Sequence, residues 1–302
     1  MSDDLIGKKC LLYAPLYDTI LILNEYIKNL NLRYHLIIAF PQIIDHFRQD
    51  HFEKIIMVNS IFDTTIPQKF PDTEICILNI DSLTNEWTLD NILGVYEKYP
   101  GIRIYDYNIE NLRLLHTTYD IQNTQFLDYV HDKEEIEPLQ QLWQTMKKIY
   151  DFGIIAYTPD ISYCPRRRVL VNDLKNRGFT VRVAHGFDRN RDIELSRCKI
   201  ILNIHGKSDN QSLPTLMFEH VRCNRLLYAG FRILSEPSII DSEFGLRYEN
   251  LKFMRYHDLL NITKEQIHRF QFDDLEFPKT VRLSEEWTRF QNEEDYLLYK
   301  KS

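Results

Sequence analysis

The sequence contains little glycine. Only 9 of its 302 residues are glycine, and no two of them are separated by a single residue. The G-x-G-x-x-G fingerprint of dinucleotide-binding folds and the G-x-x-x-x-G-K-[ST] phosphate loop are therefore both absent. A G-x-S-x-G nucleophile elbow and an H-E-x-x-H zinc motif are missing as well. These absences argue against NAD, FAD and P-loop ATP enzymes, and against the common serine hydrolases and zinc proteases.

Paired aspartates are also missing, because no D-x-D occurs anywhere in the chain. Paired carboxylates are the usual ligands of a divalent metal on a nucleotide diphosphate. The five cysteines are widely spaced and contain no C-x-x-C pair, so they indicate neither a zinc site nor a disulfide framework. We therefore expect no metal and no resident cofactor. A bound diphosphate would have to be held by cationic side chains and helix N-termini.

No apolar run approaches the roughly 20 residues that a membrane-spanning helix requires. The first residues, Met-Ser-Asp-Asp, do not resemble a signal peptide. Hydrophobic residues make up 44% of the chain and aromatic residues 13%, which is enough for a folded core. We expect a soluble protein of the cytoplasm, which would be the host cytoplasm if the source is a virus, with no membrane span.

The charge balance is unfavourable for nucleic-acid binding, since 37 basic residues stand against 44 acidic ones. The charges are not spread evenly. Residues 149–236 contain 14 basic and 9 acidic side chains, whereas the rest of the chain contains 23 and 35. This pattern favours one local site for a small anion and excludes a broad surface for a polyanion.

The chain alternates short β-rich runs with helical stretches, which predicts parallel sheets covered by helices. In the first half the expected strands are 9–13, 34–40, 54–59, 74–80 and 102–107, with helices at 18–30, 91–98 and 109–115. In the second half the expected strands are 152–157, 180–184, 199–204 and 232–234, with helices at 166–177, 189–197 and 216–227. The fold class is thus α/β, with two Rossmann-like domains in tandem.

The amphipathic stretch 132–148 has no strand pattern and is interpreted as a connecting helix. We therefore expect a first domain at 1–148, a second domain at 149–262 and a helical tail at 263–302 that packs back on the first domain. Two α/β domains of similar size suggest that a cleft separates them.

A first candidate site follows the predicted strand 152–157, where Arg166, Arg167 and Arg168 occupy the first turn of a helix. Cations are disfavoured at a helix N-terminus, and a bound anion would relieve that unfavourable interaction. A solvated basic turn is the alternative.

A second candidate is His205, which directly follows the predicted strand 199–204. Ligands of open α/β sheets bind beyond the carboxyl ends of the strands. The alternative is a loop histidine that hydrogen-bonds a nearby carbonyl.

The third candidate is the helix 216–227, in which Glu219, Arg222 and Arg225 recur every three residues and share one side. This side could form the wall of a ligand site, because a helix this apolar between two buried strands should be largely covered and charged groups there need a partner. A salt-bridged surface face is the alternative.

Taken together, the arginine run at 166–168, the strand ending in Asn-Ile-His205, the helix motif Glu219-x-x-Arg222-x-x-Arg225 and the strand ending in Ser235-Glu236 resemble a known pattern. It is similar to the nucleotide-sugar-binding half of GT-B glycosyltransferases, most of all to a subgroup found in bacteria and large DNA viruses. The resemblance covers about residues 150–236, with a weaker match at 253–259.

The resemblance implies that the second domain binds a nucleotide-diphosphate sugar and that the acceptor, a glycan or another hydroxyl compound, approaches from the first. It implies donor contacts from Arg166, Arg168, Arg222 and Arg225, a hydroxyl-binding role for Glu219, and a position near the sugar phosphate for His205, which we take as a catalytic candidate. The chain departs from many retaining members, which carry a glutamate where Arg225 aligns, so the stereochemistry stays open.

The leading hypothesis is a metal-independent glycosyltransferase. If it inverts, a base must deprotonate the acceptor, and Asp18, just beyond the first strand, is the candidate. If it retains, no such base is needed. The alternatives are a catalytically silent nucleotide-sugar-binding or scaffold protein of the same fold, and an epimerase or phosphorylase on the same architecture.

Overall fold

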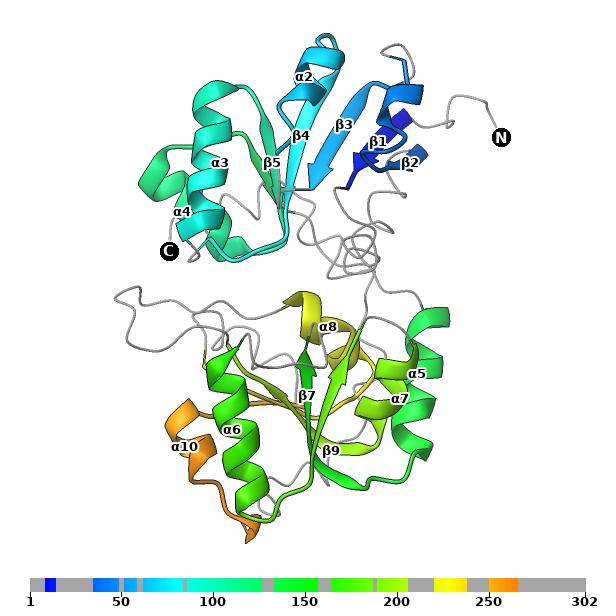
Figure 1. The fold of residues 1–302 in the computed structure, drawn as a ribbon, viewed down its shortest axis with the longest axis vertical. Coiled ribbons are helices and arrows are strands. Elements are labelled where there is room, and N and C mark those ends of the chain that lie inside the picture. Colours follow the sequence, from blue (N-terminus) through cyan, green and yellow to red (C-terminus); the bar gives the residue numbers. More distant parts are fainter. Residues whose placement is uncertain are drawn as a thin grey trace. The chain divides into compact units, whose positions relative to one another are not determined.

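The structure is a computed structural model that describes residues 9–14, 35–48, 52–58, 62–83, 86–126, 133–156, 164–186, 189–205, 220–237 and 250–265. The chain divides into two compact units, Met1–Val130 and His131–Ser302. Each unit is built around one parallel β-sheet (Figure 1).

The first unit contains a six-stranded parallel sheet with the strand order β2-β1-β3-β4-β5-β6. Its central strand β3 is buried at every position. A strand buried on both faces is typical of a parallel sheet covered by helices on each side. The strands are β1 (Lys9–Tyr13), β2 (His35–Ala39), β3 (Lys54–Val58), β4 (Glu74–Asn79), β5 (Arg103–Asp106) and β6 (Thr124–Phe126).

The helical elements of the first unit are the 3₁₀ turn η2 (Ile44–His46), α2 (Thr65–Lys69), α3 (Glu86–Lys98) and α4 (Ile109–Tyr119). One apolar cluster joins η2 and α2 to β1 and β3, through residues such as Ile44, Ile66 and Ile55. A second cluster joins α3 and α4 to β5, through Ile92, Leu115 and Ile104.

The second unit contains a five-stranded parallel sheet with the order β11-β10-β9-β7-β8. In both units the second strand in sequence pairs with one side of the first strand, and the third and later strands extend from its other side. This is the doubly wound order 2-1-3-4-5. The strands are β7 (Tyr150–Ala156), β8 (Val181–His185), β9 (Cys198–Asn203), β10 (Ile233–Ser235) and β11 (Leu251–Phe253).

Helices cover both faces of the second sheet (Figure 1). On one face, α5 (Lys133–Thr145), α7 (Arg189–Ser196) and α8 (His220–Tyr228) pack on residues such as Ile201 and Ile233. On the other face, α6 (Pro165–Asn176) and α10 (Tyr256–Leu260) pack on Phe152 and Leu202. Successive residues of each strand thus alternate between two separate apolar clusters, as the pleat requires.

The ends of α6 follow the usual local preferences. Pro165 occupies the first turn, where its missing N–H is of no consequence. Beyond the helix, Gly178 adopts φ = 83°, a left-handed conformation that glycine adopts without steric cost. These two residues fix where the arginine run begins and where the chain turns towards β8.

The predicted α/β class with two parallel, Rossmann-like sheets is confirmed. One assignment differs: α5, interpreted from the sequence as a connecting helix, belongs to the core of the second unit. Its Trp143 ring stacks on Phe231 with 4.3 Å between ring centroids. The short strands β6 and β11 were not predicted. The cleft stays a prediction, and the expected tail lies outside the described residues beyond residue 265.

Candidate functional site

The second sheet has its topological switch point between the neighbouring strands β7 and β9. From β7 the chain continues to β8 on one side of this point, and from β9 it continues to β10 and β11 on the other side. Ligands of doubly wound folds bind outside the carboxyl ends of the strands at this point. The carboxyl ends here are Ala156 of β7 and Asn203 of β9. The side chains around these strand ends are therefore the candidate site.

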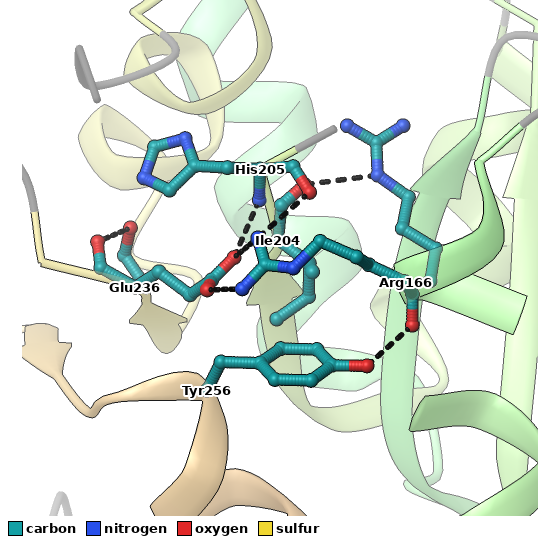
Figure 2. A network of polar contacts seen from close by, with 7 residues as sticks. Arg166, Ile204, His205, Glu236 and Tyr256 are labelled. Atoms are coloured by element: carbon teal, nitrogen blue, oxygen red, sulfur yellow. Dashed lines mark hydrogen bonds and ion pairs between the residues drawn. The ribbon is translucent and has the colours of Figure 1, made fainter. Parts of the chain in front are cut away.

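A buried ion pair joins α6 to the end of β10. Arg166 Nη2 lies 2.6 Å from Glu236 Oε1, and Arg166 Nη1 donates to Glu236 Oε2 at 3.2 Å. The side chains of Arg166 and Glu236 are 12% and 2% exposed. Figure 2 shows the Tyr256 ring packed against the Arg166 guanidinium, whose Cζ lies 4.2 Å from the ring centroid. A two-point geometry of this kind holds both side chains in one orientation.

Tyr256 connects α10 to the same arginine. Its hydroxyl donates a hydrogen bond to the Arg166 carbonyl at 2.8 Å. Burial raises the pKa of the Tyr256 phenol, while the Arg166 charge acts in the opposite direction. The phenol therefore keeps its proton at neutral pH and remains a donor.

The ion pair also fixes the segment that follows β9. The His205 backbone N–H donates to Glu236 Oε2 at 2.7 Å (Figure 2). Arg167 Nε donates to the Ile204 carbonyl at 2.9 Å. The His205 side chain is buried, and in Figure 2 its ring points away from the Arg166–Glu236 pair. Two basic residues of α6 and one carboxylate thus set the backbone position of the predicted histidine.

On the opposite face of the sheet, α8 reaches the same strand ends. Arg222 Nη1 donates to Asn203 Oδ1 at 3.1 Å. Asn203 Nδ2 in turn donates to Ser235 Oγ at 3.0 Å, and Ser235 Oγ donates to the Glu236 carbonyl at 2.9 Å. Asn203, Ser235 and Glu236 are all buried. A continuous polar network therefore crosses the carboxyl edge from α6 to α8.

One turn further along α8, Arg225 Nη2 contacts Asp192 Oδ1 of α7 at 2.6 Å. Arg191 Nη2 lies 3.4 Å from the same oxygen. All three side chains are buried or nearly so. Together with Arg166, Arg167 and Arg222, these contacts bring five arginines and two carboxylates to one edge of the sheet, which gives this group a net charge of +3 and suits an anionic ligand.

The structure brings together some of the predicted site residues. Arg166 and His205 share the Glu236 carboxylate, and Arg222 reaches β9 from the other face. Arg225 contacts α7, and Arg168 is exposed on α6, apart from this network. Asp18 and Glu219 lie outside the described residues.

Glu236, Asn203, Tyr256 and Asp192 were not predicted as site residues. Glu236 and Asn203 stand at or next to the carboxyl ends of predicted strands, which is the signal that could have identified them. Nothing in the sequence pairs Asp192 with Arg225 or Tyr256 with Arg166, because these contacts join helices that are distant along the chain.

The first unit carries a second polar cluster at the carboxyl edge of its sheet. Asp106, at the end of β5, is completely buried. Its carboxylate accepts hydrogen bonds from Asn79 Nδ2 at 2.6 Å, from the Asn108 backbone N–H at 2.8 Å and from Asn111 Nδ2 at 3.0 Å. Burial raises the pKa of Asp106 to about 8, and these donors oppose that shift.

The switch point of the first sheet lies between β1 and β3. There the Tyr13 hydroxyl, at the end of β1, donates to Asp63 Oδ2 at 3.0 Å. Burial and the nearby carboxylate raise the pKa of Tyr13 to about 12. Burial opposes ionisation of Asp63, but hydrogen bonds from Thr65 and Tyr13 hold its pKa below the usual value. Asp63 is therefore ionised at neutral pH.

Within the described ranges, no group of three or more His, Cys, Asp or Glu side chains is arranged to hold a metal ion. No helix among the described residues is long and apolar enough to span a bilayer.

No protein-family profile matches the chain. The curated relatives include "Uncharacterized protein L137" of Acanthamoeba polyphaga mimivirus, 28% identical over 258 residues, which cover 80% of this chain and 32% of that protein. They also include "Uncharacterized protein L140" of the same virus, 29% identical over 229 residues, which cover 75% of this chain and 69% of that protein. The chain thus spans about a third of the first relative's length.

Among solved structures, the chain is similar to AviGT4, a glycosyltransferase involved in avilamycin A biosynthesis. The TM-score is 0.50 at 9% sequence identity, and the match covers 94% of this chain and 97% of that one. At this identity the likeness concerns the fold alone, an α/β fold with two parallel sheets.

Proposed function

We propose that the chain is a glycosyltransferase that moves a sugar from a nucleotide-diphosphate donor to a hydroxyl acceptor, and that the donor binds at the carboxyl edge of the second sheet. The observation that carries this proposal is the approach of two helices to the same strand ends from opposite faces. Arg222 of α8 contacts the end of β9, and Arg166 of α6 contacts the end of β10 and the segment after β9. The GT-B fold is consistent with this assignment.

The two arginines are proposed to have different roles. Arg166 is held in a two-point pair with Glu236, so we assign it to positioning the His205 segment. Arg222 donates to the amide oxygen of Asn203 at the carboxyl end of β9, the edge where ligands of doubly wound sheets bind. We assign Arg222 to direct contact with the diphosphate. Arg225, one turn further along α8, is assigned a supporting position in the same site.

The chemistry is electrostatic. As the bond from the sugar to the diphosphate breaks, negative charge grows on the departing diphosphate, and prearranged cations lower the energy of that state. In this proposal Arg222 supplies that stabilisation without a metal ion, and Glu219 binds sugar or ribose hydroxyls. His205 stands next to the sugar phosphate. If the reaction inverts, Asp18 remains the candidate base for the acceptor.

Calorimetric titration with UDP, dTDP, GDP and ADP tests the proposal directly. We expect one of these nucleotides to bind, and Arg222→Ala to weaken its binding by about 10- to 100-fold, since a hydrogen bond to a charged group contributes roughly 1.5–3 kcal/mol.

Lys175→Ala is the matched control, because Lys175 is exposed near the C-terminal end of α6, at the end of the helix opposite to Arg166. It should bind the nucleotide as the wild type does. Failure of all four nucleotides to bind would refute the proposed donor site, and equal losses in both variants would indicate a general electrostatic effect. Slow hydrolysis of the matching nucleotide sugar would then separate an enzyme from a silent binding protein.

A further inference from the structure

Trp87 lies on the surface of the first unit and is unusually exposed. Its side chain retains 57% of its accessible area, the largest fraction among the exposed large hydrophobic residues of the described chain. It occupies the first turn of α3, the helix that follows β4, and so stands near the carboxyl edge of the first sheet. The opposite side of α3 is buried through Thr88 and Ile92.

Gly94 lies two turns further along the same side of α3. A Cβ atom built at Gly94 would meet no atom within 4 Å, and its backbone is not left-handed. Glycine weakens a helix interior relative to alanine, and here neither packing nor turn geometry requires it. Its effect is to leave an open gap in the side-chain cover of α3, two turns from Trp87.

Asp90 and Asn91 stand between these two positions, one turn after Trp87. The spacing i, i+3, i+4, i+7 places Trp87, Asp90, Asn91 and Gly94 on one side of the helix. Asp90 is exposed and Asn91 is partly exposed. An aromatic plane, an open gap, and a carboxylate and an amide between them thus form one short surface, here called the α3 strip.

The start of α3 is rigidly supported. The Leu83 N–H donates to Asn111 Oδ1 at 2.9 Å, and the Asp81 carbonyl accepts from Asn79 Nδ2 at 2.8 Å and from Asn111 Nδ2 at 2.9 Å. The same two asparagines hold the buried Asp106. The segment before α3 is therefore anchored to the strand ends, which prearranges a site next to it.

We infer that the α3 strip binds a saccharide chain, with one sugar ring stacked on Trp87 and hydroxyl groups bonded to Asp90 and Asn91 across the gap at Gly94. This deepens the proposed function and rests on it, because it makes the acceptor a glycan longer than one sugar. The negative face of an indole attracts the polarised C–H groups of a pyranose ring. Sugar hydroxyls can donate to a carboxylate and both donate to and accept from an amide.

The charge and size of the strip favour this occupant over others. Glu86 and Asp90 are exposed within one turn of Trp87 on α3, and they would repel a phosphate or another anion. Trp87 is the only large hydrophobic residue of α3 that is strongly exposed, and one indole offers too little apolar area for a stable protein interface. The indole ring of Trp87 does match the face of one pyranose ring in size.

The test uses the full chain labelled with 5-fluorotryptophan. The sequence has three tryptophans, so the ¹⁹F spectrum has few signals, and Trp87→Phe assigns that of Trp87. Titration to millimolar cellohexaose, chitohexaose and maltohexaose should shift the Trp87 signal until it saturates, without moving the signal of the buried Trp143. Trp87→Ala should weaken binding, read from ligand-observed spectra, by at least about tenfold.

Two matched pairs of variants control the test. Gly94→Gln fills the gap and should weaken binding by about tenfold with no loss of melting temperature, since glutamine favours a helix more than glycine does. Gly101→Gln also enters open space, outside α3, and should bind as the wild type does. Tyr119→Ala removes another exposed aromatic residue of the first unit and should bind normally.

A Trp87 signal that none of the three oligosaccharides moves overturns the inference, as does a signal that shifts with protein concentration alone, which would indicate a second copy of the chain. Nucleotide binding is measured on the same samples. If the nucleotide binds and no oligosaccharide does, the α3 strip is refuted and the proposed donor site stands. If an oligosaccharide binds and no nucleotide does, the reverse conclusion follows.

Discussion

The Arg166 guanidinium and the Glu236 carboxylate form a two-point ion pair, with Nη2–Oε1 at 2.6 Å and Nη1–Oε2 at 3.2 Å. The pair joins the first turn of α6 to the end of β10, although 70 residues separate the two along the chain. The same carboxylate holds the His205 N–H. One acidic residue therefore organises three segments of the candidate site.

Glu236→Ala should destabilise the second unit strongly. The change leaves the Arg166 charge buried without its carboxylate, and breaking a buried pair in this way costs about 3–5 kcal/mol. Urea unfolding followed by circular dichroism measures the loss. Glu236→Gln, which keeps the shape and one acceptor, should cost less. A loss below about 1 kcal/mol for the alanine variant would show that the pair behaves like an exposed one.

Donor binding should persist when divalent metals are removed. The sequence has no D-x-D, and the proposed diphosphate contacts come from arginines. Nucleotide affinity measured by calorimetry should therefore be the same with EDTA as with magnesium. A loss of more than about tenfold, which corresponds to about 1.4 kcal/mol, would mean that a metal ion takes part.

Asp106 should make the first unit less stable as the pH rises. Burial raises the pKa of its carboxyl from 3.8 to about 8. Between these values the folded chain retains a proton that the unfolded chain has released, so the free energy of unfolding falls as the pH increases, by up to about 1.4 kcal/mol per pH unit for this group. Below pH 3.8 this contribution is fully present, and above about pH 8 it is lost.

Asp106→Asn is the comparison for this prediction, because an amide does not titrate. Urea unfolding of both proteins from pH 5 to pH 8 should show a steeper decline in the wild type. Parallel curves would mean that Asp106 is ionised in the folded chain throughout that range.

Trp143→Ala should destabilise the second unit by about 3–5 kcal/mol, as for other buried aromatic residues cut to alanine. Trp143 is buried and stacks on Phe231, which places α5 in this core. Trp87→Ala is the control, since an exposed side chain should change stability by less than about 0.5 kcal/mol. If the two variants unfolded alike, α5 would be a loosely attached connector, as the sequence suggested.

The regular parts of the fold could be predicted because their signals are local. The β1 strand begins and ends at the predicted residues, and β7 and β9 agree within two residues. His205 was identified for the same reason, since it directly follows a predicted strand, and Arg166 was identified because it lies in the first turn of a predicted helix. Their common partner Glu236 could not be assigned, because the pairing depends on how β9 and β10 meet in space.

The role of α5 could not be predicted either. A charged stretch followed by an amphipathic one fits a connecting helix as well as a core helix, and only the contact between Trp143 and Phe231 distinguishes them. The predicted strand 102–107 contains Asp106, but the surroundings of this carboxylate depend on Asn79 and Asn111, which come from other elements.

The contact between Tyr256 and Arg166 has a consequence for synthesis on the ribosome. The second sheet grows outward from β7, and its edge strand β11 and the helix α10 emerge last. Until then the apolar side of α6 lacks Leu259 and Ile262, which complete its cluster. A nascent chain stopped before Tyr256 would display that uncovered surface, so ribosome stalling in this region should make the product a substrate for chaperones and proteases.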